Sequence, residues 1–151
     1  GACIKLNGAE HCMVANNTVI GFYDGLSAGS SSIIADNIIR DTENVAIRCN
    51  GDHMIIKSNQ IINASYGCMA NKTEFNYLTI TDNHLQQCKE YAISLVSSNN
   101  TIKNNVVTDS KIAIRLADKA ERNKVTGNTG SNNDRNIRKG NATNTFSENF
   151  K

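Results

Sequence analysis

The chain has 151 residues, of which 39% are hydrophobic and 5% aromatic, and it contains neither tryptophan nor proline. A chain of this length corresponds to one domain, and so few large rings argue against a globular core built on aromatic side chains. The formal net charge of +2 is too small to indicate nucleic-acid binding. No apolar run approaches the length of a membrane span. We therefore expect neither a nucleic-acid partner nor membrane insertion.

A motif of the form apolar-x-x-Asn recurs along the chain. It ends at Asn17, Asn37, Asn59, Asn83, Asn105 and Asn128, with a last echo at Asn149. The steps between these asparagines are 20, 22, 24, 22, 23 and 21 residues. A near-constant period of this size indicates a solenoid, in which each repeat stacks on its neighbours.

A second motif lies between the asparagines and reads small, apolar, variable, apolar. Its copies are residues 3–6, 25–28, 46–49, 67–70, 92–95 and 113–116. Such alternation predicts a strand with every second side chain pointing inward. One unit then offers three short strands, at residues 77–80, 84–86 and 92–95, and no segment keeps a helical period over ten or more residues.

These repeats resemble the right-handed parallel β-helix of the pectate-lyase-like superfamily, which includes polysaccharide lyases, hydrolases, epimerases and phage tailspikes. The resemblance covers roughly residues 2–130. It predicts an all-β, single-stranded solenoid of about six coils of about 22 residues, with three parallel sheets around an aliphatic core. It also implies that the asparagines stack as a ladder at the turn between the second and third sheets, in left-handed backbone conformation. Their role is then structural.

The two ends of the chain differ from the middle. The chain opens inside a first-sheet strand, so we expect a fragment that continues upstream in a parent protein. We assign residues 1–130 to the coils and residues 131–151 to a degenerate last coil or C-terminal cap, in which Phe146 and Phe150 fold over the coil below. Disorder of this polar, basic tail is the alternative.

The outward positions of the first sheet carry the candidate binding residues. By alternation they are Lys5, Ser27, Arg48, Met69, Ser94, Arg115 and Arg138, of which four are cationic. In relatives that bind glycans, the ligand often lies along this face. The resemblance therefore implies that Lys5, Arg48 and Arg115 bind the carboxylates of a polysaccharide. Ordinary surface charge is the competing interpretation.

Two acids form the candidate catalytic pair. Glycosidases need two carboxylates, and Asp24 and Glu43 precede first-sheet strands on neighbouring coils, which predicts a separation of about 5 to 9 Å. Arg48 would lie close by. The sequence lacks the clustered aspartates of calcium-dependent pectate lyases, and without proline it cannot contain the Asp-Pro-His pattern of alginate epimerases.

Two classes of function remain open. The first is a carbohydrate-active domain that binds and degrades a bacterial or plant polysaccharide, as a glycoside hydrolase or a lyase. The second is a non-catalytic rod, such as a fibre or adhesin segment. Similarity to tailspikes implies a homotrimer and an extracellular or virion location for the parent protein. We expect no cofactor and no metal, and the five cysteines, Cys3, Cys12, Cys49, Cys68 and Cys88, lack metal-binding spacing and are expected to be unpaired.

Overall fold

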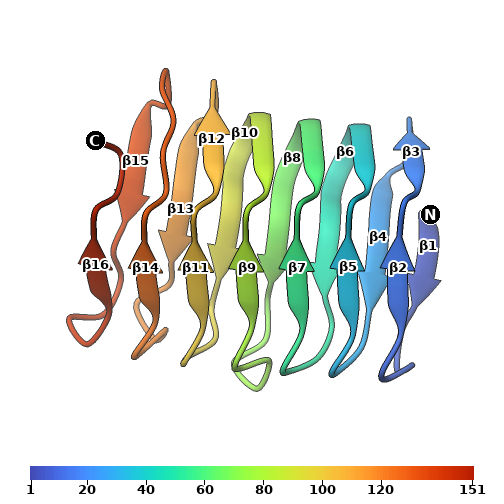
Figure 1. Cartoon of the computed structure of the whole chain (residues 1–151), viewed down its shortest axis with the longest axis horizontal. Coiled ribbons are helices and arrows are strands. Elements are labelled where there is room, and N and C mark those ends of the chain that lie inside the picture. The colour runs from blue at the N-terminus through green and yellow to red at the C-terminus, as the bar shows by residue number, and fades with distance from the viewer.

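The computed structural model describes residues 1–151, and it is a parallel β-solenoid with strands stacked along one axis (Figure 1). It contains no helix, and therefore none long and apolar enough to cross a membrane. All strand pairs are parallel. Each coil passes through three faces, which we number in chain order.

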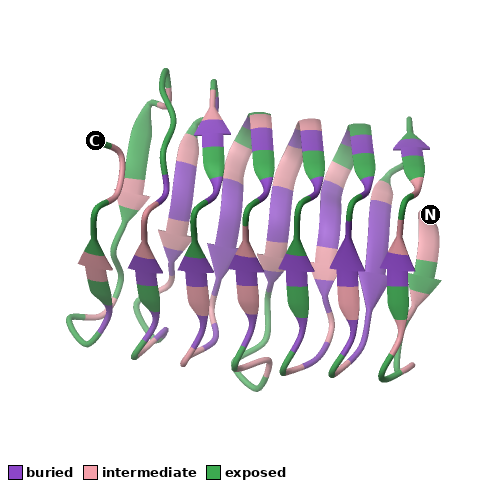
Figure 2. Cartoon of the chain, viewed as in Figure 1, coloured by how far each residue is buried: buried purple, intermediate pink, exposed green.

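The second face is a separate sheet of seven strands, so the solenoid has seven coils where the sequence predicted about six. Its strands are β2 (Met13–Ala15), β5 (Ile33–Ala35), β7 (Ile55–Lys57), β9 (Thr79–Thr81), β11 (Thr101–Lys103), β14 (Lys124–Thr126) and β16 (Thr145–Ser147). From β2 to β14 the middle residue of each strand is buried (Figure 2). The period-2 pattern therefore places one Val or Ile per coil in the core.

The first and third faces are hydrogen-bonded into one nine-stranded sheet, although the sequence predicted two. Three long strands bend around the corner and belong to both faces: β6 (Ile38–Cys49), β8 (Gln60–Ala70) and β10 (His84–Leu95). The first face also contains β1 (Ala2–Leu6), β4 (Asp24–Ala28), β13 (Ile112–Leu116) and β15 (Arg135–Arg138). The third face also contains β3 (Thr18–Ile20) and β12 (Val106–Thr108).

The predicted asparagine ladder runs the length of the molecule. In each rung the Nδ2 group donates to Oδ1 of the asparagine one coil further on, at 2.9 to 3.0 Å from Asn17 through Asn149. The backbone N–H of each asparagine donates to the same Oδ1 atom. These bonds satisfy amides that would otherwise be costly to bury.

The prediction that the ladder asparagines adopt the left-handed conformation is wrong. The residue before each of them does so instead, with φ between 54° and 67° at Asn16, Asp36, Ser58, Asp82, Asn104, Gly127 and Glu148. The turn is made by this residue, which is exposed at every rung except Gly127, where it is half-buried. The ladder asparagine that follows can therefore direct its side chain inward, towards the next coil.

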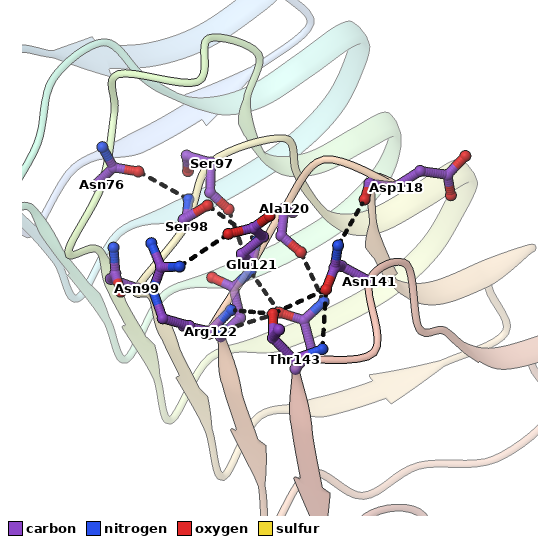
Figure 3. A network of polar contacts seen from close by, with 12 residues as sticks. Asn76, Ser97, Ser98, Asn99, Asp118, Ala120, Glu121, Arg122, Asn141 and Thr143 are labelled. Carbon is purple, nitrogen blue, oxygen red and sulfur yellow. Dashed lines mark hydrogen bonds and ion pairs between the residues drawn. The ribbon is translucent and has the colours of Figure 1, made fainter.

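A second ladder, which the sequence analysis missed, lies where the chain enters the second face. Asn100 donates its backbone N–H to Asn123, and Asn123 donates its N–H and Nδ2 to Asn144, at 2.9 to 3.0 Å. The adjoining corner holds further polar contacts between successive coils, such as Arg122 to Asn99 and Asn141 to the carbonyl of Asp118 (Figure 3). These contacts join coils and leave no recess between them.

Residues 131–151 continue the solenoid. β15 pairs with β13, β16 pairs with β14, and Asn149 accepts the last ladder bonds. Phe146 and Phe150 are partly buried and pack against the core.

Candidate functional site

The outward side chains of the first face form a single column along the molecular axis. The strand register pairs Lys5 with Ser27, Ser27 with Arg48, and so on through Met69, Ser94, Arg115 and Arg138. Successive coils lie about 4.8 Å apart. Lys5 and Arg48 are thus about 10 Å apart along the axis, and Arg48 and Arg115 about 14 Å.

The two central arginines of this column bend back to the preceding coil in the same way. Arg48 Nη2 lies 3.3 Å from Asp24 Oδ1, and the Arg115 guanidinium lies 5.3 Å from the centroid of the Tyr91 ring. Asp24 and Tyr91 occupy equivalent strand positions in their own coils, three residues before the column. In both cases an arginine of the column contacts the side chain three positions earlier on the preceding coil.

A recess of about 220 Å³ lies at the N-terminal end of this face and is lined by Gly1, Ala2, Lys5, Asn7, Asp24, Ser27 and Arg48. It brings together three predicted site residues, Lys5, Asp24 and Arg48. The side chains of Arg48 and Asp24 remain 23% and 24% exposed, so their ion pair faces the recess and stays open to solvent. Two cations and one carboxylate line the recess, which gives it an excess of positive charge.

One carboxylate oxygen of Asp24 accepts three hydrogen bonds. Asn44 Nδ2, the backbone N–H of Val45 and Arg48 Nη2 lie 3.0, 3.2 and 3.3 Å from Oδ1. Oδ2 accepts no hydrogen bond within the chain. The carboxylate is thus fixed in orientation while one oxygen stays free for a ligand.

Glu43 lies on the coil next to Asp24 but outside the recess. Its backbone N–H donates to Phe22, two residues before Asp24, and its side chain is exposed and makes no hydrogen bond within the chain. The register between β6 and β8 shifts between Thr42 and Val45, because Glu43 and Asn44 occupy a β-bulge. Bulges re-aim side chains and are frequent beside active sites. Here the bulge turns Asn44 onto Asp24.

Arg115 lies apart from the N-terminal recess, in a cluster that the sequence analysis missed. The rings of Tyr66 and Tyr91 are 5.8 Å apart, and Arg115 both covers Tyr91 and donates to Ser94 Oγ at 3.2 Å. Its Nε atom is buried and has no partner. The sequence contained a signal for this cluster, because each tyrosine directly precedes the small residue that opens a copy of the second motif.

No three His, Cys, Asp or Glu side chains gather in a geometry that could ligate a metal ion. All five cysteines are free. Three of them lie in the core, where burial raises the pKa of Cys49 and Cys88 to about 12 and that of Cys68 well above its usual range. These thiols are therefore protonated, unreactive core side chains.

Comparison with known proteins agrees with this architecture. The sequence model described as "Right handed beta helix region" matches residues 2–150. No curated protein and no solved structure matches the chain significantly. Since the family pattern covers nearly all of the chain, and the strands form the parallel coils that it describes, the chain belongs to the right-handed β-helix family.

Proposed function

We propose that this chain is the β-helix part of a carbohydrate-active protein, and that its first face binds an acidic polysaccharide. The observation that carries the proposal is the outward column in which Lys5, Arg48 and Arg115 share one register. Guanidinium groups bind carboxylates through two parallel hydrogen bonds. A linear polymer with carboxylates along its length is the ligand that such a column fits.

The spacing supports separate contacts along an extended chain. The steps of about 10 Å and 14 Å are too long for two of these cations to share one carboxylate. The N-terminal recess would hold one acidic unit against Lys5 and Arg48. Tyr66 and Tyr91 would offer flat rings for the apolar face of a sugar further along, beside Arg115.

Degradation of the bound polymer is the finer part of the proposal, with Asp24 and Glu43 as the catalytic carboxylates. Asp24 faces the cationic recess with Oδ2 free, and Glu43 is exposed on the bulge of the adjacent coil. In hydrolysis, one carboxyl group protonates the leaving oxygen, while the other attacks the sugar or activates water. A ligand spanning from the recess to the bulge would meet both.

The test is whether the chain cleaves acidic polysaccharides, and the release of new reducing ends measures the rate of cleavage. We expect Asp24→Asn and Glu43→Gln each to lower the rate at least a hundredfold with the fold intact, since general acid and base groups contribute about 10² to 10⁴ in rate. The control is Asp36→Asn, an exposed acid at another corner of the coil, which should change nothing. An unsaturated product would indicate a lyase. Unchanged cleavage in both variants would refute the assignment of the pair.

A non-catalytic rod is the second candidate function. It is favoured by the ladder that continues without a break from Asn17 to Asn149, because such ladders serve rigidity and not chemistry. If the chain neither binds nor cleaves any acidic polysaccharide, the rod is the function that remains.

A further inference from the structure

The three methionines of the chain lie in three different settings. Met54 is fully buried in the core, and Met13 is 69% exposed on the second face. Met69 is half-buried on β8 and belongs to the outward column of the first face, between Arg48 and Ser94. Met69 is therefore the methionine that both reaches solvent and lies next to a candidate binding residue.

The Arg48 guanidinium connects side chains from the two coils on either side of it. Its Nη2 group donates to Asp24 Oδ1 on the preceding coil at 3.3 Å, and its Nη1 group lies 3.9 Å from Met69 Sδ on the following coil. A carboxylate is a strong acceptor, whereas a thioether sulfur is a weak one. The Nη1 group can therefore leave Met69 at little cost and donate to a ligand instead.

Oxidation changes Met69 from a weak acceptor into a strong one. Hydrogen peroxide transfers one oxygen atom to the thioether: the O–O bond breaks, an S–O bond forms, the sulfur loses two electrons, and the second oxygen leaves as water. The product, methionine sulfoxide, is a polar side chain. Since the Met69 sulfur already faces Arg48 Nη1, and a methionine side chain is flexible, the new oxygen can reach that group.

We infer that Met69 is a redox-sensitive residue that regulates Arg48. With Met69 reduced, the Nη1 group is available to a ligand. With Met69 oxidised, the sulfoxide oxygen holds Nη1 while Asp24 holds Nη2, so a ligand carboxylate must break one of these bonds to bind. The effect on binding rests on the function proposed above for the N-terminal recess, whereas the contact between the sulfoxide and Arg48 does not.

The order in which peroxide oxidises the methionines tests the first requirement of the inference. We expect Met13 to react first, Met69 second and Met54 last, because the rate follows the exposure of the sulfur. Mass spectrometry of peptides from the treated chain measures this order. Oxidation of Met54 before Met69 would contradict the inference, since Met69 would then not be the accessible sulfur beside Arg48.

Nuclear magnetic resonance tests the contact itself, in the absence of any ligand. In a Met13→Leu chain, peroxide should shift the Arg48 Nε–H signal and slow hydrogen exchange of its guanidinium. Methionine sulfoxide reductases for both epimers should reverse these changes. The control is Met69→Leu in the same chain, which lacks the thioether and should not respond. Unchanged Arg48 signals in a chain with oxidised Met69 would overturn the inference.

Binding of polygalacturonate, alginate and hyaluronate measures the consequence for the N-terminal recess. Oxidation of Met69 should weaken binding about threefold to tenfold, the effect of one hydrogen bond. Met69→Gln, which offers an amide oxygen, should weaken binding without peroxide, whereas Met69→Leu should bind normally and ignore peroxide. Equal binding by the reduced and oxidised chains would refute the regulation. If none of the polymers binds, the proposed function fails, and the Arg48 signals alone decide the inference.

Discussion

A ladder asparagine is hydrogen-bonded both to the coil before it and to the coil after it. Asn59 donates to Asn83 Oδ1 through its backbone N–H and its Nδ2 group, and it accepts from both groups of Asn37. Its Nδ2 also donates to the carbonyls of Ile34 and Lys57. Because Asn59 is buried, none of these groups can turn to water instead.

Replacing such an asparagine should therefore cost much of the stability of the domain. We predict that Asn59→Leu lowers the free energy of unfolding by about 3 to 5 kcal/mol, since each buried group left without a partner costs about 1 to 3 kcal/mol. Urea unfolding followed by circular dichroism measures it. The control is Asn17→Leu at the first rung, which is half-buried and accepts no ladder bond, and which should cost roughly half as much. A neutral Asn59→Leu would contradict the stabilising role of the ladder.

At this scale the sequence predicted the ladder but not the residues around it. Seven asparagines at near-constant spacing identify the first ladder. The second was hidden, because the positions equivalent to Asn100 in earlier coils hold Ser32, Met54 and Leu78. The left-handed residue before each rung varies from Asp to Gly. Five of the seven are Asn, Asp or Gly, which tolerate this conformation, so residue type carried part of the signal, whereas at Ser58 and Glu148 the turn imposes it.

Among the elements, the first-face strands come closest to one another at the small residue that opens the second motif, as at Gly25 and Gly67. A Cβ atom added at Gly67 would meet the carbonyl oxygen of Ala92 on the next coil and the Leu85 side chain inside. Ala92 and Ala113 hold the equivalent position in later coils. The second motif begins with a small residue because the strand bends into the core there.

Gly67→Ala should therefore destabilise the solenoid without touching the outer face. We expect a loss of about 1 to 3 kcal/mol, the usual cost of overpacking a filled core, and a lower midpoint of thermal unfolding. Gln60→Ala, in the exposed part of the same strand, should leave the midpoint where it is. An unchanged midpoint in Gly67→Ala would show that the coils can separate locally to admit a methyl group.

The bulges could not be predicted from the length of the repeats. The unit from Asn83 to Asn105 has 22 residues and contains a bulge at Lys89 and Glu90, whereas the unit from Asn105 to Asn128 has 23 residues without one. A longer loop at the other corner, before β14, makes up the difference. The count of residues per unit does not say at which corner an extra residue lies.

For the whole molecule, the fold fixes a straight outer face while the turns decide what that face can bind. Alternation in the sequence was enough to place Lys5, Arg48 and Arg115 in one outward column, and the strand register agrees. The N-terminal recess was beyond sequence reasoning, because it depends on how side chains from several coils combine at the surface. Glu43 illustrates this: its coil was predictable, but its place outside the N-terminal recess was not.

The most direct test is the affinity of the chain for acidic polysaccharides, measured by calorimetry with polygalacturonate, alginate and hyaluronate. We predict that at least one binds, that affinity falls as salt rises, and that Lys5→Ala and Arg48→Gln each weaken it about tenfold, the loss of one charge-assisted hydrogen bond. Lys57→Ala, an exposed lysine on the second face, should bind as tightly as the unaltered chain. Absence of binding by all three polymers, or equal binding by the Lys5 and Arg48 variants, would contradict the account.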